Sequence, residues 1–331
     1  SQAGNASYAP ATSMTQMFTI TPGVNTITFP PPVDTAFTSA PPTLTATASS
    51  LLPISYSSNS LTICTVTSPG VITFVATGTC SITAAQGGSV SFVPAMSVTQ
   101  TFQITPGVNT ITFPQPTDTQ FTSAPPTLTA SASSGLPISY SSNSPTICTV
   151  TTGGVLTFVS GGPCAIVAAQ AGNGNYVAAT SVTRTFLVTP GVNTITFPQP
   201  TDTPFSSTPP MLAASASSGL AISYLTVTPT TCTVTPTGVI TFVAAGACSV
   251  TATQGGNGSY LPAGLVTRTF TITLGANVIT FPLPPDTPYT ATPPTMGATA
   301  SSGLPISYSG GGGSCTVTVG GVITFLTVGT C

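Results

Sequence analysis

Hydrophobic and polar residues alternate along most of this chain with a period of two, not with the 3.6-residue period of a helix. Val98, Phe102 and Ile104, for example, alternate with threonine and glutamine. Such alternation, rich in Val, Ile, Thr and aromatic residues, is typical of a β-strand that buries one face. Further along the chain the same pattern predicts strands at 128–133, 138–140, 148–150, 156–158 and 164–168. Gly and Pro pairs between the strands predict turns, and no run of ten residues has helical spacing.

The whole pattern repeats along the chain with a period of about 84 residues, which indicates an array of similar structural units. The segment Thr-Pro-Gly-Val-Asn-Thr-Ile-Thr-Phe-Pro occurs at 21–30, 105–114 and 189–198, and a variant of it occurs at 273–282. We therefore expect repeats at 21–104, 105–188 and 189–272, an incomplete repeat at 273–331 without its last strand or strands, and, at 1–20, the terminal strand region of a preceding or partner repeat.

The two ends of the sequence fall inside a repeat, because Gln2 corresponds to Gln86 and the last residue is Cys331. A strand at 14–20 is expected, by correspondence with 98–104. Two interpretations fit this phase. The sequence is a window of a longer array, or it is a subunit whose open end is completed by a strand from the next copy.

About seven strands in each repeat is typical of an immunoglobulin-like β-sandwich. The third repeat reads Asn-Thr-Ile-Thr-Phe at 193–197, Gly-Val-Ile-Thr-Phe at 238–242 and Gln-Gly-Gly-Asn-Gly-Ser-Tyr at 254–260. In this combination it resembles the bacterial immunoglobulin-like (Big-type) repeats of very large secreted and surface proteins, over nearly the whole chain. The resemblance implies an all-β fold of tandem immunoglobulin-like sandwiches arranged as an elongated rod. It also implies an extracellular structural or adhesive role, and it transfers no catalytic residue.

Charged residues make up only 2% of the sequence: two Arg, four Asp, and no Lys, Glu or His. General acid–base catalysis needs titratable side chains placed beside a partner, and nucleic-acid binding needs clustered Lys and Arg. We therefore expect no enzyme activity, no catalytic, cofactor-binding or metal site, and no nucleic-acid partner. No apolar run approaches the length of roughly 18 residues that a membrane-spanning helix needs, so no membrane span is expected.

Eight cysteines form four pairs, and the two members of each pair are 16 residues apart. This spacing fits neither a zinc site nor a Cys-x-x-Cys redox motif. We expect one disulfide per repeat, each closing a short loop around a strand hairpin: Cys64 with Cys80, Cys148 with Cys164, Cys232 with Cys248, and Cys315 with Cys331. The alternatives are buried free thiols, and a periodic pairing across repeats such as Cys80 with Cys148. Disulfides would place the chain outside the reducing cytosol.

The charged residues occupy two repeated positions. Asp34, Asp118, Asp202 and Asp286 each follow a proline-rich step, and Arg184 and Arg268 lie on the last expected strand of the repeat before Asp202 and Asp286. One hypothesis is a salt bridge at the repeat junction, Arg184 with Asp202 and Arg268 with Asp286. The alternative is a solvated Asp that caps a turn with its own backbone. The salt bridge cannot be general, because Gln16 and Gln100 stand at the arginine position in the earlier copies.

A repeated aromatic position, Tyr8, Phe92, Tyr176 and Tyr260, is expected to pack in the fold or to form a sugar-stacking platform. Taken together, the sequence predicts a non-enzymatic structural protein, a filament or stalk that is extracellular or on the cell surface. Its main partner would be itself, as a homopolymer or as neighbouring repeats. The alternative function is an adhesin that binds a glycan or a host or cell surface through exposed loops.

Overall fold

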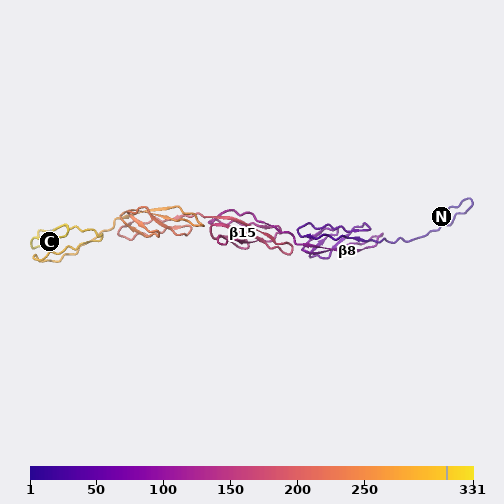
Figure 1. Cartoon of the computed structure of the whole chain (residues 1–331), viewed down its shortest axis with the longest axis horizontal. Coiled ribbons are helices and arrows are strands. Elements are labelled where there is room, and N and C mark those ends of the chain that lie inside the picture. The colour runs from indigo at the N-terminus through magenta and orange to yellow at the C-terminus, as the bar shows by residue number, and fades with distance from the viewer. Residues whose placement is uncertain (311) are drawn as a thin grey trace. The chain divides into compact units, whose positions relative to one another are not determined.

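The computed structural model describes residues 1–310 and 312–331, and every regular element in them is a β-strand. Each complete repeat forms its own sandwich of strands (Figure 1). The first contains β1 (Ile27–Thr28), β2 (Thr35–Ala36), β3 (Thr47–Ala48), β4 (Ser55–Ser58), β5 (Cys64–Val66), β6 (Ile72–Phe74), β7 (Gly78–Gln86) and β8 (Ala95–Thr105). The described residues contain no helix that could cross a membrane.

The same eight strands recur in the next two repeats. The second contains β9 (Ile111–Thr112), β10 (Thr119–Gln120), β11 (Ser131–Ala132), β12 (Ser139–Ser142), β13 (Cys148–Val150), β14 (Leu156–Phe158), β15 (Gly162–Gln170) and β16 (Ala179–Thr189). The third contains β17 (Ile195–Thr196), β18 (Thr203–Pro204), β19 (Ser215–Ala216), β20 (Ser223–Thr226), β21 (Cys232–Val234), β22 (Ile240–Phe242), β23 (Gly246–Thr253) and β24 (Val266–Thr273). The fourth contains β25 (Ile279–Thr280), β26 (Thr299–Ala300), β27 (Cys315–Val317) and β28 (Ile323–Phe325).

The second repeat illustrates the topology. One sheet has the strand order β10-β16-β15-β12, and two shorter ladders, β9-β11 and β13-β14, lie on the other side of the core. The pairs within these sheets are antiparallel except β10 and β16, which run parallel with Thr119 opposite Val188. The first and third repeats have the same order. The predicted all-β fold of tandem immunoglobulin-like sandwiches is thus confirmed.

A proline-rich step divides the first strand of each sandwich in two. In the second repeat β9 pairs in one layer, the chain crosses at Phe113-Pro114-Gln115-Pro116, and β10 pairs in the other layer. Proline has no amide hydrogen to donate to a ladder, so strand pairing stops where prolines cluster. This split gives eight strands where about seven are expected. We call the segments between the two halves, 29–34, 113–118 and 197–202, the strand switches.

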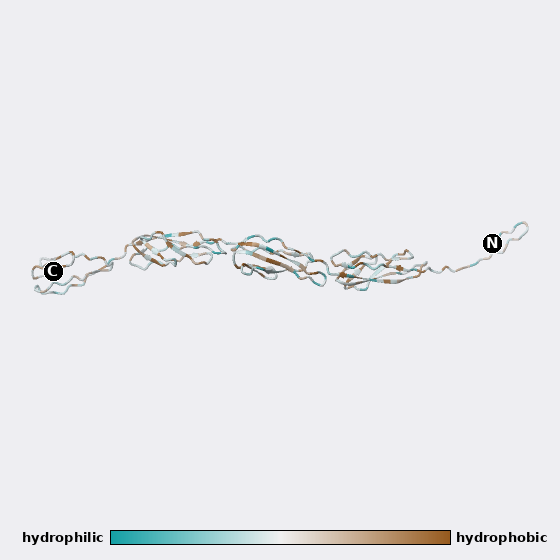
Figure 2. Cartoon of the chain, in the orientation of Figure 1, coloured by the Kyte–Doolittle hydropathy of each residue, from teal (hydrophilic) through white to brown (hydrophobic). Residues whose placement is uncertain are grey.

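The core of each sandwich is built from the residues that the alternation turns inward. In β15 the side chains of Cys164, Ile166 and Ala168 are fully buried, and Phe186 of β16 is 3% exposed. Figure 2 shows β15 as one of the more hydrophobic segments of the repeat. Burying each large apolar side chain stabilises the fold by roughly 1.5–3 kcal/mol. Each core cluster draws its residues from one repeat only.

A buried amide pair ties the start of each complete repeat to the end of its long strand. Asn109 is 4% exposed, and its Nδ2 donates to Oε1 of Gln170. The same Gln170 oxygen accepts from the backbone amide of Gly172, and Asn109 Oδ1 accepts from the amide of Ser134. Asn25 with Gln86 and Asn193 with Gln254 repeat the contact. Because the amide groups find partners, their burial carries little penalty.

The chain divides into two compact units, Ser1–Thr189 and Pro190–Cys331. In the first unit, residues 12–20 form no strand, and Met14, Met17 and Phe18 are exposed. The strand expected at 14–20 is therefore absent from the structure, because a strand in this fold needs the neighbour that β7 provides for β8. In the second unit, the fourth repeat is one residue shorter between Tyr308 and Cys315, a stretch that includes Gly311, outside the described residues.

Candidate functional site

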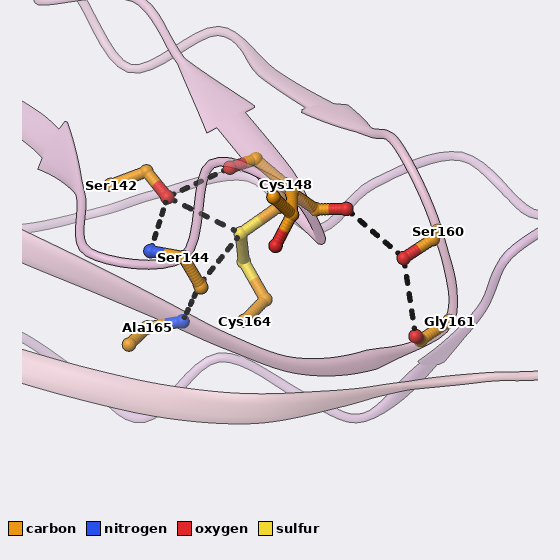
Figure 3. Close-up of a disulfide and its surroundings, with 8 residues drawn as sticks. Ser142, Ser144, Cys148, Ser160, Gly161, Cys164 and Ala165 are labelled. Carbon is orange, nitrogen blue, oxygen red and sulfur yellow. Dashed lines mark hydrogen bonds between the residues drawn. A yellow bond between two sulfur atoms is a disulfide. The ribbon is translucent and has the colours of Figure 1, made fainter. Parts of the chain in front are cut away.

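All eight cysteines are disulfide-bonded in the pairs Cys64–Cys80, Cys148–Cys164, Cys232–Cys248 and Cys315–Cys331. Each bond closes a loop that contains a strand hairpin, but its two cysteines are not paired with each other across that hairpin. Cys148 begins β13, and its partner across the β13-β14 hairpin is Phe158, whereas Cys164 lies on β15 in the other sheet. The disulfide therefore joins the two layers of the sandwich through the core (Figure 3).

Hydroxyl groups surround each disulfide of the complete repeats. Ser142 Oγ donates to the carbonyl oxygen of Cys148 at 2.7 Å, and Ser144 Oγ accepts from the amide of Ala165 at 2.8 Å (Figure 3). Both hydroxyls also lie within 3.7 Å of Cys148 Sγ. These contacts hold the segment between β12 and β13 against Cys148 and Ala165. The cysteine sulfurs are fully buried there, which keeps solvent reductant away from the bond.

The charged side chains act at the strand switch. Asp118 Oδ1 accepts from the backbone amide of Leu187 on β16 at 2.7 Å, and Arg184 Nε donates to the carbonyl of Phe113 at 2.8 Å. Gln115 Nε2 donates to the carbonyl of Thr185 at 2.7 Å. Side chains of the switch thus bond the edge of β16 where the backbone of β10 does not reach it. The third repeat repeats the set with Asp202, Arg268 and Gln199.

A neutral residue makes the same bond as arginine in the first repeat. Gln100 Nε2 donates to the carbonyl of Phe29 at 2.8 Å, which matches the Arg184 contact with Phe113 in both partner and length. Asp34 Oδ1 accepts from the amide of Gln103 at 2.7 Å. The feature that the repeats share at this position is therefore a long side chain with an N–H donor, and its positive charge is secondary.

These contacts bear on both hypotheses for the charged residues. Asp34, Asp118 and Asp202 bond the last strand of their own repeat, far along the chain, and do not cap their own turn. Among the described residues no ion pair joins Arg268 to Asp286, and Arg268 bonds Phe197 in its own repeat. The junction pairs Arg184 with Asp202 and Arg268 with Asp286 stay a prediction.

In the first unit, a loop of the second repeat docks on the end of the first repeat. Asn175 Oδ1 accepts from the backbone amide of Thr77 at 2.9 Å, and Thr77 Oγ1 donates to the carbonyl of Gly174 at 2.7 Å. The ring of Tyr176 meets the ring of Phe37 edge-on, with centroids 5.6 Å apart. Two hydrogen bonds and an aromatic pair of this kind each contribute roughly 0.5–1.5 kcal/mol. We call residues 173–176 the docking loop.

The docking loop is shaped by its own first residue. Asn173 Oδ1 accepts from the amides of Asn175 and Tyr176, at 2.9 and 3.0 Å. This Asx turn presents the two contact residues to the neighbouring repeat. Gly107, near the start of the second repeat, lies beside the loop, since its amide donates to the carbonyl of Asn175 at 2.9 Å. A Cβ at Gly107 would clash with Thr38 of the first repeat, so this close approach requires glycine.

The second unit shows the same close approach without the loop. A Cβ at Gly275 would lie 3.0 Å from Ser206, the counterpart of Thr38. Beside it a cavity of about 510 Å³ is lined by Phe205 and Ala245, the counterparts of Phe37 and Thr77. None of the residues that line this cavity takes the place of the docking loop. The cavity therefore has the location that the loop fills in the first unit.

Sequence reasoning identified the aromatic position of Tyr176 but not its partners. Phe37 recurs as Phe121 and Phe205, but Thr77 and Asn175 have different residues at the corresponding positions of the other repeats, so no sequence signal marked them. The buried pair Asn109–Gln170 was likewise missed, although two amide residues at fixed repeated positions were a usable signal. Among the described residues no three potential ligands of the His, Cys, Asp and Glu types come together.

No protein-family model matches the chain, and no curated protein sequence matches it. Among solved structures, Drosophila N-cadherin EC1-3 aligns with 74% of this chain and 98% of its own, at 10% identity and a TM-score of 0.28. Sidekick-1 immunoglobulin domains 1-5 align with 75% of this chain and 59% of their own, at 13% identity and a TM-score of 0.30. Domains 1-6 of the surface layer protein SbsC align with 91% of this chain and 44% of their own, at 13% identity and a TM-score of 0.26. Because these TM-scores are low, we take neither fold nor function from them.

Proposed function

We propose that this chain is a non-enzymatic, extracellular structural protein whose sandwiches form part of a filament or cell-surface stalk. The observation that carries the proposal is the docking loop, which bonds one repeat to the end of the preceding one through Thr77 and Phe37. A chain of independent binding modules needs no such contact between modules. A stalk does need it, because its stiffness depends on how each repeat is held against the next.

The remaining features agree with this role. The three complete repeats have the same strands and the same cross-sheet disulfide. Structural disulfides persist in oxidising surroundings, which supports a location outside the cell or on its surface. Equivalent repeats make other repeats of the same kind the natural partners, either along one chain or between copies.

The orientation of the first repeat relative to the second tests this proposal. Residual dipolar couplings of the full chain should fit one alignment tensor for residues 21–188. The double variant Asn175→Ala, Tyr176→Ala should need two tensors, because the hydrogen bond to Thr77 and the ring contact with Phe37 are both lost. Val90→Ala is the matched control, since Val90 lies in the corresponding loop of the first repeat and is 96% exposed. Two independent tensors in the wild-type chain would contradict the stalk.

The alternative function, an adhesin, predicts a different result. Saturable binding of a glycan by the full chain, abolished by substitution of one exposed loop, would favour the adhesive role. A structural array should show no such binding across a glycan panel.

A further inference from the structure

The docking loop and its counterpart in the third repeat, residues 257–260, both begin with asparagine followed by glycine. Asn173-Gly174 and Asn257-Gly258 are the only Asn-Gly pairs in the sequence, and all four residues are exposed. Asparagine is a chemically labile residue, since the next peptide nitrogen can attack its side-chain carbonyl. Glycine in the next position favours this attack, because it has no Cβ to crowd the ring that closes.

The fold of the loop does not require either glycine. A Cβ at Gly174 or Gly258 would have no neighbour within 4 Å, and the φ of neither residue lies in the left-handed region. Residues 5–8 correspond to the docking loop and have alanine at this place. There the side chain of Asn5 accepts from two backbone amides at 2.9 and 3.0 Å, as that of Asn173 does. The same turn therefore forms with alanine, and packing does not explain the glycine.

The turn polarises the carbonyl group that is attacked. Two backbone amides donate to Asn173 Oδ1, at 2.9 and 3.0 Å, and two donate to Asn257 Oδ1, at 2.8 and 3.0 Å. When a nitrogen adds to Cγ, this oxygen takes on negative charge, and a pair of backbone amides stabilises such a charge. The amides of Gly174 and Gly258 donate no hydrogen bond to any residue that the structure describes, so each nitrogen can react without breaking one.

The reaction is an intramolecular deamidation whose only other reactant is water. The nitrogen of Gly174 bonds to Cγ of Asn173 and gives up its proton, and the Cγ–Nδ2 bond breaks. Ammonia leaves with that proton, and a cyclic succinimide remains. Water then opens the ring at either of its carbonyl groups. One opening yields aspartate, and the other yields isoaspartate, in which the backbone runs through the former side chain and is longer by a single carbon.

Conversion changes both the docking contact and the charge of the chain. Thr77 bonds the carbonyl of Gly174 and Oδ1 of Asn175, the two residues that directly follow position 173. An extra backbone carbon just before them displaces both groups, so the two bonds to the first repeat cannot form together. Each conversion also adds one negative charge, and two conversions therefore take the formal net charge from −2 to −4.

We infer that Asn173 and Asn257 are sites of spontaneous modification, which convert to aspartate and isoaspartate as the protein ages. Isoaspartate at position 173 releases the docking loop from the first repeat. The chemistry does not depend on the proposed stalk, whereas its effect on the joint rests on that function. A stalk with this loop is stiff at the joint between its first and second repeats when it is new, and that joint loosens with age.

Peptide mapping of the full chain, by mass spectrometry with isoaspartate labelling, follows the conversion during incubation at neutral pH. Positions 173 and 257 should convert at least about tenfold faster than Asn5, a difference of about 1.4 kcal/mol in activation free energy. Asn5 is the internal control, because its side chain accepts from the same two donors but is followed by alanine. A smaller ratio, or no conversion at position 173, would overturn the inference.

Gly174→Ala is the matched variant, because Asn5 shows that alanine keeps the turn. It should slow conversion at position 173 to the rate of Asn5 and leave position 257 unaffected. An unchanged rate at position 173 would overturn the role of the glycine.

Dipolar couplings then test the effect on the joint. The isolated isoaspartate form of the wild type should need two alignment tensors for residues 21–188, whereas Gly174→Ala after the same incubation should fit one. One tensor for the isoaspartate form would overturn the release of the docking loop. Two tensors for the fresh wild type would instead overturn the stalk and leave the conversion standing.

Discussion

The third repeat and the described part of the fourth have nearly the same first-strand sequence but different burial. Phe197 is 2% exposed, whereas its counterpart Phe281 is 52% exposed. The short-range structure is nevertheless the same in both. β25 pairs with β26 as β17 pairs with β19, and β27 pairs with β28 as β21 pairs with β22. The Phe281–Tyr308 rings also meet edge-on at 5.8 Å, as the Phe197–Tyr224 rings do.

The difference lies in the long sheet. In the third repeat β23 and β24 cover the core, and Phe270 and Ile272 of β24 are buried against it. Among the described residues of the fourth repeat, only the ladders β25-β26 and β27-β28 are present, and no strand takes the place of β24. Hairpins, turns and the disulfide thus form from neighbouring sequence, while burial of the first strand depends on a strand at the far end of the repeat. This dependence on distant pairing is the usual reason that sandwiches fold more slowly than helical proteins.

The largest expected effect is on the aromatic residue of the first strand. Phe197→Ala should destabilise the third repeat by about 3–5 kcal/mol, because it empties a packed core. Phe281→Ala should change the fourth repeat by less than about 1 kcal/mol, since that ring is half exposed. Hydrogen exchange of β23 and β24, compared with that of β27 and β28, measures both. Similar losses of stability in the two repeats would show that the first-strand aromatic residue contributes equally to both.

Removing the cross-sheet bond should have the next largest effect. The double variant Cys232→Ala, Cys248→Ala should destabilise the third repeat by about 3 kcal/mol, as expected for a closed loop of this length. Calorimetry of the full chain should show one transition moving down while those of the other repeats stay. In the fourth repeat, Cys315→Ala with Cys331→Ala should abolish exchange protection of β27 and β28, because less core is available there. Retained protection would show that these strands do not depend on the disulfide.

The buried amide pair gives the smallest of the three effects. Asn193→Ala leaves the amide of Gln254 without its partner and should cost about 1–3 kcal/mol. Asn277→Ala, at the exposed counterpart in the fourth repeat, should cost less than about 0.5 kcal/mol. Chemical denaturation followed by tyrosine fluorescence can compare the two variants. An equal cost would mean that the Asn–Gln contact itself contributes little.

The sequence predicts the faces of the strands well and their partners less well. The inward positions Cys164, Ile166 and Ala168 are fully buried, because a period of two decides which side chains share a face. The same period does not say which strand lies alongside. For this reason the sequence predicted that the disulfide closes a loop around a hairpin, which it does, but not that Cys148 and Cys164 belong to different sheets.

The candidate site was harder to predict for a related physical reason. The side chain of Arg184 is long enough to reach in either direction along the chain, and the choice of the Phe113 carbonyl depends on where the strand switch lies in space. The docking loop likewise acts on Thr77, which belongs to the preceding repeat. Neither contact has a local sequence pattern. Recurrence from one repeat to the next identified Arg184 as a candidate, because Arg268 stands at the same position, but it gave no such signal for Thr77.

The central claim is that each complete repeat is a sandwich with its own core and an internal disulfide. Pulling the wild-type full chain at both termini tests this most directly. Without reductant, three events should each release the length of one repeat less the 16 residues that its disulfide retains. With reductant each event should be followed by a further extension of roughly 55 Å, the span of that retained segment when it is fully extended, because unfolding exposes the buried bond to the reductant. A single event for the whole chain, or release lengths that ignore the reductant, would contradict the account.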